Sequence, residues 1–212
     1  MIRHILFDLD GTLYSQQEDL QDFFTKRLRE FTSSWLGLPW EECEPLWRDA
    51  LKRYGTTLEW LIKEKGFSNP DAFFAHVHPE NEADFLPYDP ELRGFLEKLN
   101  LPCSILTNSP GFHAERIIKK LKLEGLFQHV FAIDSSGLGG KPDPSAYYRA
   151  LDAFGLKPEE MLFIDDVPRY AEGYVKIGGI GILLDEKDTH KDYPHWRIKS
   201  IREIIQFMDN AC

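Results

Sequence analysis

The sequence has little cysteine. Its 212 residues include three cysteines, Cys43, Cys103 and Cys212, and no two of them have the spacing of ligands to one metal ion. So sparse a set excludes a disulfide-stapled scaffold and a cysteine-based zinc site. We therefore expect reduced thiols and a cytoplasmic protein.

Long hydrophobic runs and an excess of basic residues are also missing. No apolar segment approaches the length of a membrane-spanning helix, and the amino terminus leads into an apolar strand without room for a signal peptide. Lys and Arg number 25 against 35 Asp and Glu, so the net charge is -10. This charge argues against nucleic acid and membrane surfaces as partners, and it requires a local cation wherever an anion binds.

The residues that are present indicate a folded chain. Hydrophobic residues make up 42% of it, with 15 Phe, 8 Tyr and 5 Trp, a composition typical of globular proteins. The length allows one core of ordinary size with a smaller inserted domain.

Residues 15–87 predict an all-helical insertion. Apolar residues recur there at three- and four-residue spacing, and successive runs stop near Gly37, Gly55 and Gly66. Asn69 followed by Pro70 predicts the cap and first turn of a fourth helix.

Residues 1–14 and 88–212 predict the main domain. Apolar strands alternate there with amphipathic helices, which indicates a Rossmann-like α/β core, a parallel sheet with helices on both faces. The expected strands end at Phe7 or span 103–107, 129–133, 161–164 and 180–184; the expected helices begin at Asp89, Ser109 and Asp143, with a last one over 198–208. Residues 185–197 are expected to be irregular.

The first strand ends in two aspartates, Asp8 and Asp10. Residues two apart on a strand point the same way. At about 4 Å and a dielectric near 20 their carboxylates would repel by roughly 4 kcal/mol, so they need a cation or a shared proton. An Asp-Gly turn in water is the simplest alternative. A calcium loop is excluded, because Leu13 stands where that loop needs glycine.

Other polar residues follow later strands: Thr107-Asn108, Lys141-Pro142 and Asp165-Asp166. Alone, each has a simpler explanation as a strand end, a solvated loop lysine or a helix cap. A nucleotide-binding loop at Lys141 is excluded, because Ser135 and Pro142 stand where glycine and Ser or Thr belong. Ligands bind beyond the carboxyl ends of parallel strands, so we expect these residues and the aspartate pair to share one crevice.

With Asp8-Leu9-Asp10-Gly11-Thr12 and these three features in this order, the chain resembles the haloacid dehalogenase (HAD) superfamily of phosphohydrolases over its whole length. The helical insertion resembles the C1 cap of that superfamily. The resemblance implies that Asp8 is the nucleophile, which accepts the phosphoryl group, and that Asp10 is the general acid and base. It implies that Gly11, Thr107, Asn108 and Lys141 bind the substrate phosphate, and that Thr107 and Lys141 also act in catalysis.

The resemblance further implies a Mg²⁺ cofactor, with Asp8, the Asp10 carbonyl and Asp166 as ligands and Asp165 bound directly or through water. Oxygen ligands suit this cation, and the charges of the carboxylates and a phosphate demand one. Two positions depart from the family, which often has Ser or Thr after the acidic pair and Asp or Asn four residues after its second member. Here these positions hold Val167 and Tyr170. We expect the metal to be supported differently, with Arg169 as a candidate participant.

Short patterns are similar to the pyrimidine 5′-nucleotidase branch: Leu13-Tyr14, residues 54–58 and His113-Ala114. This resemblance makes Tyr14, Tyr54 and His78 candidates for stacking on a base. We expect Trp35, Trp47 and Trp60 to lie in the core of the insertion instead.

The sequence thus predicts Mg²⁺-dependent hydrolysis of a small phosphomonoester through an aspartyl phosphate, with a pyrimidine nucleoside monophosphate as one candidate. A sugar phosphate or other metabolite as substrate, and phosphomutase activity, are the alternatives. A metal-free dehalogenase would have little use for Asp10 and Asp166, and a non-catalytic binding module would account for Val167 and Tyr170. We expect a monomer or homodimer whose partner is a small phosphorylated metabolite, with a hinge at residues 14–16 and 86–88.

Overall fold

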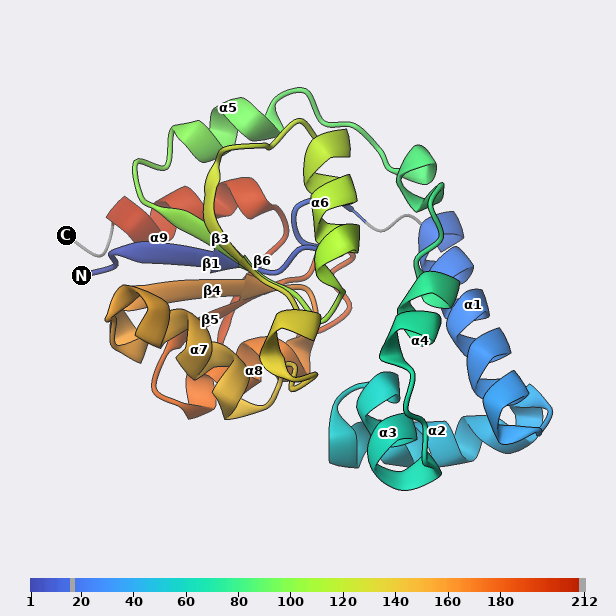
Figure 1. Ribbon diagram of the computed structural model, residues 1–212. Coiled ribbons are helices and arrows are strands. Elements are labelled where there is room, and N and C mark those ends of the chain that lie inside the picture. The colour runs from blue at the N-terminus through green and yellow to red at the C-terminus, as the bar shows by residue number, and fades with distance from the viewer. Residues whose placement is uncertain (16–17, 210–212) are drawn as a thin grey trace. The chain divides into compact units, whose positions relative to one another are not determined.

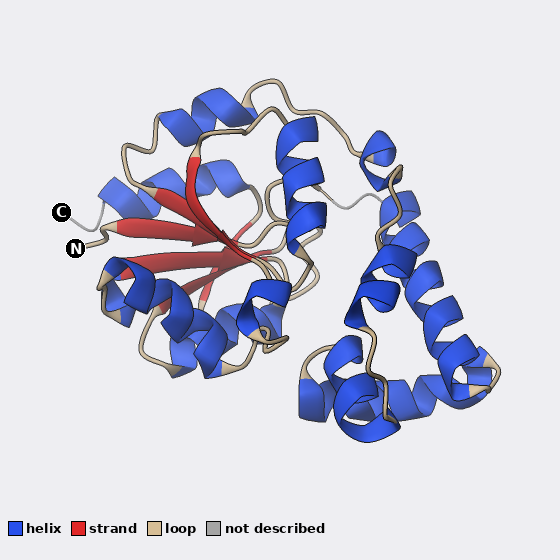
Figure 2. Cartoon of the chain, in the orientation of Figure 1, coloured by secondary structure: helices blue, strands red, loops and turns tan. Residues whose placement is uncertain are grey.

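The computed structural model describes residues 1–15 and 18–209, which fall into two compact units (Figures 1 and 2). One unit comprises Met1–Ser15 and Pro87–Cys212, and the other comprises Gln16–Leu86. Gln16, which belongs to one of the expected hinges, and Cys212 lie outside the described residues.

The first unit is built on a six-stranded sheet in the order β3-β2-β1-β4-β5-β6. Every neighbouring pair of strands is parallel. The strands are β1 (His4–Phe7), β2 (Cys103–Leu106), β3 (Phe127–Phe131), β4 (Met161–Asp165), β5 (Ile180–Leu184) and β6 (Trp196–Ile198). The predicted α/β class with a parallel sheet is confirmed.

Helices cover both faces of this sheet, with α5 and α9 on one side and α7 and α8 on the other (Figure 1). Asp143 begins α7 as predicted, because its side chain accepts the amide of Ser145. The helices of the first unit are α5 (Leu92–Glu97), α6 (Gly111–Lys120), α7 (Pro144–Phe154), α8 (Pro168–Lys176) and α9 (Ile205–Asp209), with 3-10 turns η2 (Asp134–Ser136), η3 (Pro158–Glu160) and η4 (Ile201–Ile204).

The core holds the central strand β1 in place. All four residues of β1 are buried, and Leu6 packs with Phe163 of β4 and Tyr147 of α7 in one apolar cluster. Burying a side chain of this size stabilises the fold by roughly 1.5–3 kcal/mol. Asp8 therefore follows a rigid strand flanked by β2 and β4.

Two predicted helix starts, at Asp89 and at Ser109, are wrong. The side chains of both residues form hydrogen bonds other than a helix cap. Helix α5 begins at Leu92 and not at Asp89, whose carboxylate accepts the amide of Glu91 at 2.9 Å and a hydrogen bond from Arg202 at 2.6 Å. Helix α6 begins at Gly111 with no side-chain cap, and Ser109 donates to Asp10 instead.

The end of the chain also differs from the prediction. Strand β6 lies within and beyond the segment expected to be irregular, where Ile182 of β5 pairs with Trp196 and the Asp185 amide donates to the Ile198 carbonyl at 2.8 Å. The last helix is divided into η4 and α9 and begins after Ser200, which caps η4 by accepting the Arg202 amide.

Among its described residues, the second unit contains helices and loops and no strand (Figure 2). Helix α1 packs against α2 and α4, and α2 packs against α3. Trp60 is fully buried and Trp47 donates to Thr57 at 2.8 Å, but Trp35 is 45% exposed and so is not the core residue predicted. The elements are α1 (Glu18–Leu36), α2 (Trp40–Tyr54), α3 (Thr57–Lys65), α4 (Pro70–Val77) and the 3-10 turn η1 (Glu82–Phe85).

The thiols and the hydropathy of the helices were also the subject of expectations. Cys43 and Cys103 are free and buried. Among the described residues, no helix combines the length and the hydropathy needed to cross a bilayer.

Candidate active site

Most of the predicted site residues of the first unit follow the carboxyl ends of β1, β2 and β4. The Asp8 amide donates to the Ile164 carbonyl of β4 at 2.8 Å, and the Thr107 amide donates to the Phe131 carbonyl of β3 at 3.0 Å. Asp165 is the last residue of β4. The peptide ladders thus fix the backbone from which each side chain leaves the sheet.

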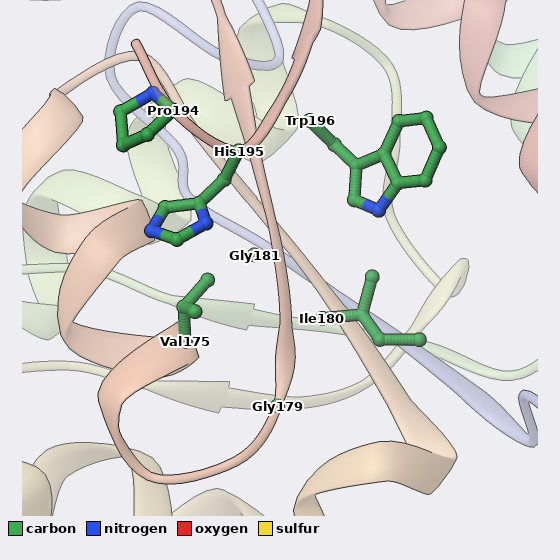
Figure 3. A pocket seen from close by; sticks show the side chains of 7 residues that line it. All are labelled: Val175, Gly179, Ile180, Gly181, Pro194, His195 and Trp196. Carbon is green, nitrogen blue, oxygen red and sulfur yellow. The ribbon is translucent and has the colours of Figure 1, made fainter.

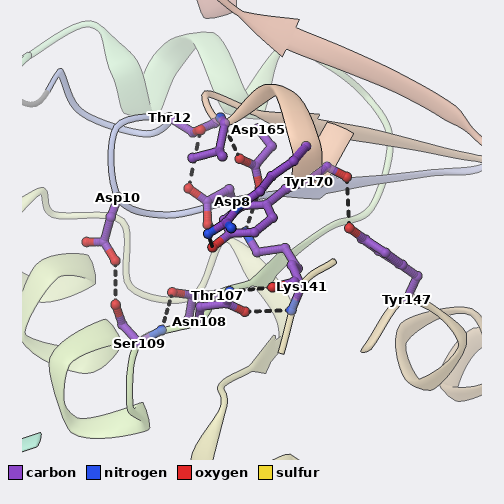
Figure 4. A network of polar contacts seen from close by, with 12 residues as sticks. Asp8, Asp10, Thr12, Thr107, Asn108, Ser109, Lys141, Tyr147, Asp165 and Tyr170 are labelled. Carbon is purple, nitrogen blue, oxygen red and sulfur yellow. Dashed lines mark hydrogen bonds and ion pairs between the residues drawn. The ribbon is translucent and has the colours of Figure 1, made fainter. Parts of the chain in front are cut away.

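Lys141 joins two of these strands (Figure 4). Its Nζ donates to Asp8 Oδ1 at 2.5 Å and to Asp165 Oδ2 at 2.6 Å. The lysine side chain is 1% exposed, so the charge it supplies is poorly screened by water. Asp165 also accepts the Val167 amide at 2.8 Å, which holds its other oxygen.

The protonation of these groups reflects burial and mutual charge. Burial raises the pKa of Asp8 to about 7, although the charge of Lys141 acts in the opposite direction. Burial, and then the charges of Asp165 and Asp8, raise the pKa of Asp166 to about 9. Burial alone would lower the pKa of Lys141, but the charges of Asp165 and Asp8 outweigh it and raise this pKa. The site has more negative charge than its lysine can neutralise.

A divalent cation fits this arrangement. Asp8, Asp165 and Asp166 each offer a carboxylate oxygen, and these atoms lie within 4.8 Å of one another. Asp166 Oδ1 is buried and has no hydrogen-bond partner among the residues that the structure describes. Clustered carboxylates with an unpaired buried oxygen are a suitable donor set for Mg²⁺.

Because Gly11 has no side chain, the Asp166 carboxylate can lie against its backbone. A Cβ atom at this position would lie 2.3 Å from Asp166 Oδ2, and the backbone has a φ of +88°. A side chain would therefore displace the carboxylate and strain the turn. This contact gives Gly11 a role in shaping the acidic cluster, beside the phosphate contact that the resemblance implies.

Asp10 belongs to a separate hydrogen-bond network. Tyr14 OH donates to its Oδ1 at 2.5 Å, and Ser109 donates to its Oδ2 at 2.6 Å. His113 Nε2 lies 2.7 Å from Oδ1. Burial alone would raise the pKa of Asp10, but the charge of His113 and the hydrogen bonds of His113, Ser109 and Tyr14 hold it below its usual range.

Thr107 and Asn108 have different tasks in the structure. Thr107 Oγ1 accepts the Ser109 amide at 2.9 Å, which leaves its hydroxyl proton to be donated. The Asn108 side chain instead binds the backbone of Lys141: Nδ2 donates to its carbonyl at 2.9 Å, and Oδ1 accepts its amide at 2.8 Å. Gly140 permits this approach, since a Cβ there would lie 2.5 Å from Asn108 Oδ1.

The structure therefore brings Asp8, Asp165, Asp166 and Lys141 into one cluster and places the Asp10 carboxylate in contact with other groups. Sequence reasoning missed Ser109, which it treated as a helix cap. It noted His113 only as part of a family pattern. The available signal was the spacing Thr107-Asn108-Ser109, which places a hydroxyl two residues after Thr107, the last residue of the predicted strand.

A pocket of about 400 Å³ lies elsewhere in the first unit (Figure 3). Gly179, Ile180 and Gly181 line it at the amino end of β5, together with His195 and Trp196 at the start of β6. None of the predicted site residues contributes to this pocket.

The comparison with protein families decides the family. The model of the haloacid dehalogenase-like hydrolases matches residues 2–173. The chain belongs to this family. A phosphoglycolate phosphatase of Mannheimia succiniciproducens is 26% identical over 95% of this chain and 96% of its own length. A glyceraldehyde 3-phosphate phosphatase of Methanocaldococcus jannaschii is 24% identical over 99% of this chain and 98% of its own length.

Solved structures share the fold of this HAD-like hydrolase. The L-2-haloacid dehalogenase RSc1362 superimposes with a TM-score of 0.65 at 22% identity, over 98% of this chain and 99% of the dehalogenase. At that identity the similarity concerns the fold alone. It supports the α/β architecture and leaves the reaction to the chemistry of the site.

Proposed function

We propose that this HAD-like hydrolase is a Mg²⁺-dependent phosphatase of a small phosphomonoester. The observation that carries the proposal is the cluster of Asp8, Asp165 and Asp166 around Lys141. The relatives that match nearly the whole chain are named as phosphatases of small metabolites, which supports the same chemistry.

In the first half-reaction, a carboxylate oxygen of Asp8 attacks phosphorus while the bond from phosphorus to the ester oxygen breaks. The aspartyl phosphate divides one difficult displacement into two easier ones. The Thr107 hydroxyl and the Lys141 ammonium stabilise the phosphoryl oxygens as charge shifts between them. The leaving oxygen takes its proton by way of Asp10. Because the neighbours of Asp10 favour its ionised form, that proton is supplied by the His113 imidazolium, whose Nε2 lies 2.7 Å from Asp10 Oδ1.

In the second half-reaction, water attacks the phosphorus and the bond to Asp8 breaks. Asp10 accepts the proton of the water, and its neighbours prepare it for this step because they favour its ionised form. Asp8, Asp166 and Asp165, with the Asp10 carbonyl, would hold Mg²⁺. When bound, the cation supplies positive charge beside the phosphate.

Dehalogenase activity is the second candidate function, because the L-2-haloacid dehalogenase RSc1362 has the same fold as this chain. Displacement of a halide also uses an aspartate nucleophile but gives no task to the unpaired oxygen of Asp166. We therefore favour the phosphatase. The second unit, residues 16–86, is proposed to be the cap that selects the substrate.

The deciding experiment measures hydrolysis of p-nitrophenyl phosphate with and without Mg²⁺. We expect activity that needs the metal and is lost in Asp8→Asn, which keeps the shape of the side chain. Undiminished turnover by this variant would refute the proposal. A panel of nucleoside monophosphates, sugar phosphates and phosphoglycolate then ranks the substrate classes, including the pyrimidine nucleotides that the short sequence patterns favour.

A further inference from the structure

The Lys141 ammonium is surrounded by carboxylates on one part of its surface and by aromatic rings on another. Its Nζ lies 5.4 Å from the centre of the Phe163 ring and 5.2 Å from that of Tyr170. Two of its three N–H groups donate to Asp8 and Asp165. A cation this close to the face of a desolvated ring is attracted by the electron density of the ring.

Tyr170 is held so that its ring stays at this place. The Tyr147 hydroxyl donates to the Tyr170 carbonyl at 2.8 Å, and Arg169 Nη2 donates to the Tyr170 hydroxyl at 2.9 Å. Gly173 allows α8 to lie close to Tyr147 and Pro142, because a Cβ at this position would lie 2.7 Å from Tyr147 OH and 3.1 Å from Pro142 Cβ. The ring also packs against the apolar cluster of the core.

This position is one of the two at which the sequence departs from its family. A carboxylate or amide at residue 170 could accept a hydrogen bond from the lysine, whereas an aromatic face attracts the charge without accepting a conventional one. The third N–H of Lys141 then has no acceptor among the described side chains. It is left to donate to a phosphoryl oxygen.

We propose that Tyr170 is a positioning residue, whose ring holds the Lys141 ammonium beside Asp8 and Asp165 while leaving one of its N–H groups for the substrate. The inference rests on the proposed phosphatase function, because phosphoryl transfer is what the oriented lysine assists. Displacement of the Lys141 ammonium from this position should reduce its stabilisation of the transition state more than its contribution to substrate binding.

The test compares Tyr170→Phe, which keeps the ring, with Tyr170→Leu, which removes it, using p-nitrophenyl phosphate and saturating Mg²⁺. We expect Tyr170→Phe to keep kcat within about twofold and Tyr170→Leu to lower it about tenfold, with KM changed by less than about twofold. Equal kcat values for Tyr170→Leu and Tyr170→Phe would overturn the inference.

A second measurement does not depend on catalysis. In protein labelled with ¹³C-lysine, the ε-CH₂ protons of Lys141 should be shifted upfield by the ring, retain that shift in Tyr170→Phe and lose part of it in Tyr170→Leu. Tyr170→Met replaces Tyr170→Leu if the latter does not fold. A wild-type protein without phosphatase activity would refute the proposed function, whereas an unchanged Lys141 signal in the ring-free variant refutes the positioning role alone.

Discussion

The side chain of Asn108 forms a pair of hydrogen bonds with the backbone of Lys141, one to its carbonyl at 2.9 Å and one from its amide at 2.8 Å. These bonds tie the segment after β2 to the loop that carries the lysine. The resemblance implies that Asn108 binds the substrate phosphate, as a backbone donor or as a positioning residue. The structure adds that its side-chain amide binds the lysine backbone, so this side chain acts on the reaction through Lys141.

Asn108→Ala should lower kcat by about tenfold to a hundredfold, because the lysine loses the contacts that fix its backbone. The free energy of unfolding should fall by roughly 1–3 kcal/mol, since two backbone groups lose their partners. Steady-state kinetics and urea denaturation measure the two effects. Asn81→Ala is the matched control, because Asn81 is exposed and its side chain caps no helix. A kcat equal to that of this control would contradict the assigned role.

Gly11→Ala should destabilise the protein and abolish most activity. Gly125→Ala is its control: the φ values are similar, +88° and +79°, but a Cβ at Gly125 would meet nothing within 4 Å. Both substitutions incur backbone strain of about 1–2 kcal/mol, and only the first also collides with Asp166. Denaturation midpoints and turnover should therefore separate the two variants, and equal losses in both would show that the contact with Asp166 is unimportant.

Removal of Mg²⁺ with EDTA should stop turnover, and added Mg²⁺ should restore it. Asp166→Asn should raise the Mg²⁺ concentration for half-maximal activity by at least about tenfold, because it removes a charged oxygen ligand. Asp152→Asn, at an exposed position of α7, is the control. If Asp166→Asn has the same Mg²⁺ requirement as the wild type, the assignment of Asp166 to the metal is wrong.

His4 should make stability depend on pH below neutrality. Its ring stacks on Phe154 at 4.2 Å and its Nε2 lies 3.0 Å from Ser104 Oγ. Burial lowers the pKa of His4 from 6.5 to about 4. Between these values the unfolded chain binds a proton that the folded protein does not, so the contribution of His4 is complete above pH 6.5 and is lost as the pH falls toward 4.

The measurement for His4 is the free energy of unfolding from pH 7.5 to 4.5 in the wild type and His4→Gln. Other groups titrate in both proteins, so the informative quantity is their difference, which should shrink as the pH falls. His129→Gln, at an exposed position, serves for comparison. A difference that does not change with pH would contradict the expectation.

The sequence sufficed for the sheet and for most of the acidic site, because both depend on patterns along the chain. Apolar runs predicted five of the strands, and the placing of Asp8 and Asp165 at strand ends predicted their convergence. Strand β6 was missed because three residues among polar neighbours carry no periodic signal, and its formation depends on pairing with β5. Ser109 was misjudged for a related reason: a hydroxyl before a helix suits a cap, and only the fold places Asp10 within its reach.

The bond between Lys141 and Asp8 joins residues 133 positions apart in the chain. A ribosome producing this protein from its amino terminus therefore releases Asp8, the proposed nucleophile, long before the lysine that binds it. Until β4 also emerges, β1 lacks one of its two neighbouring strands. The reactive centre is consequently assembled late in synthesis, and a chain cut short before residue 165 leaves the ribosome without it.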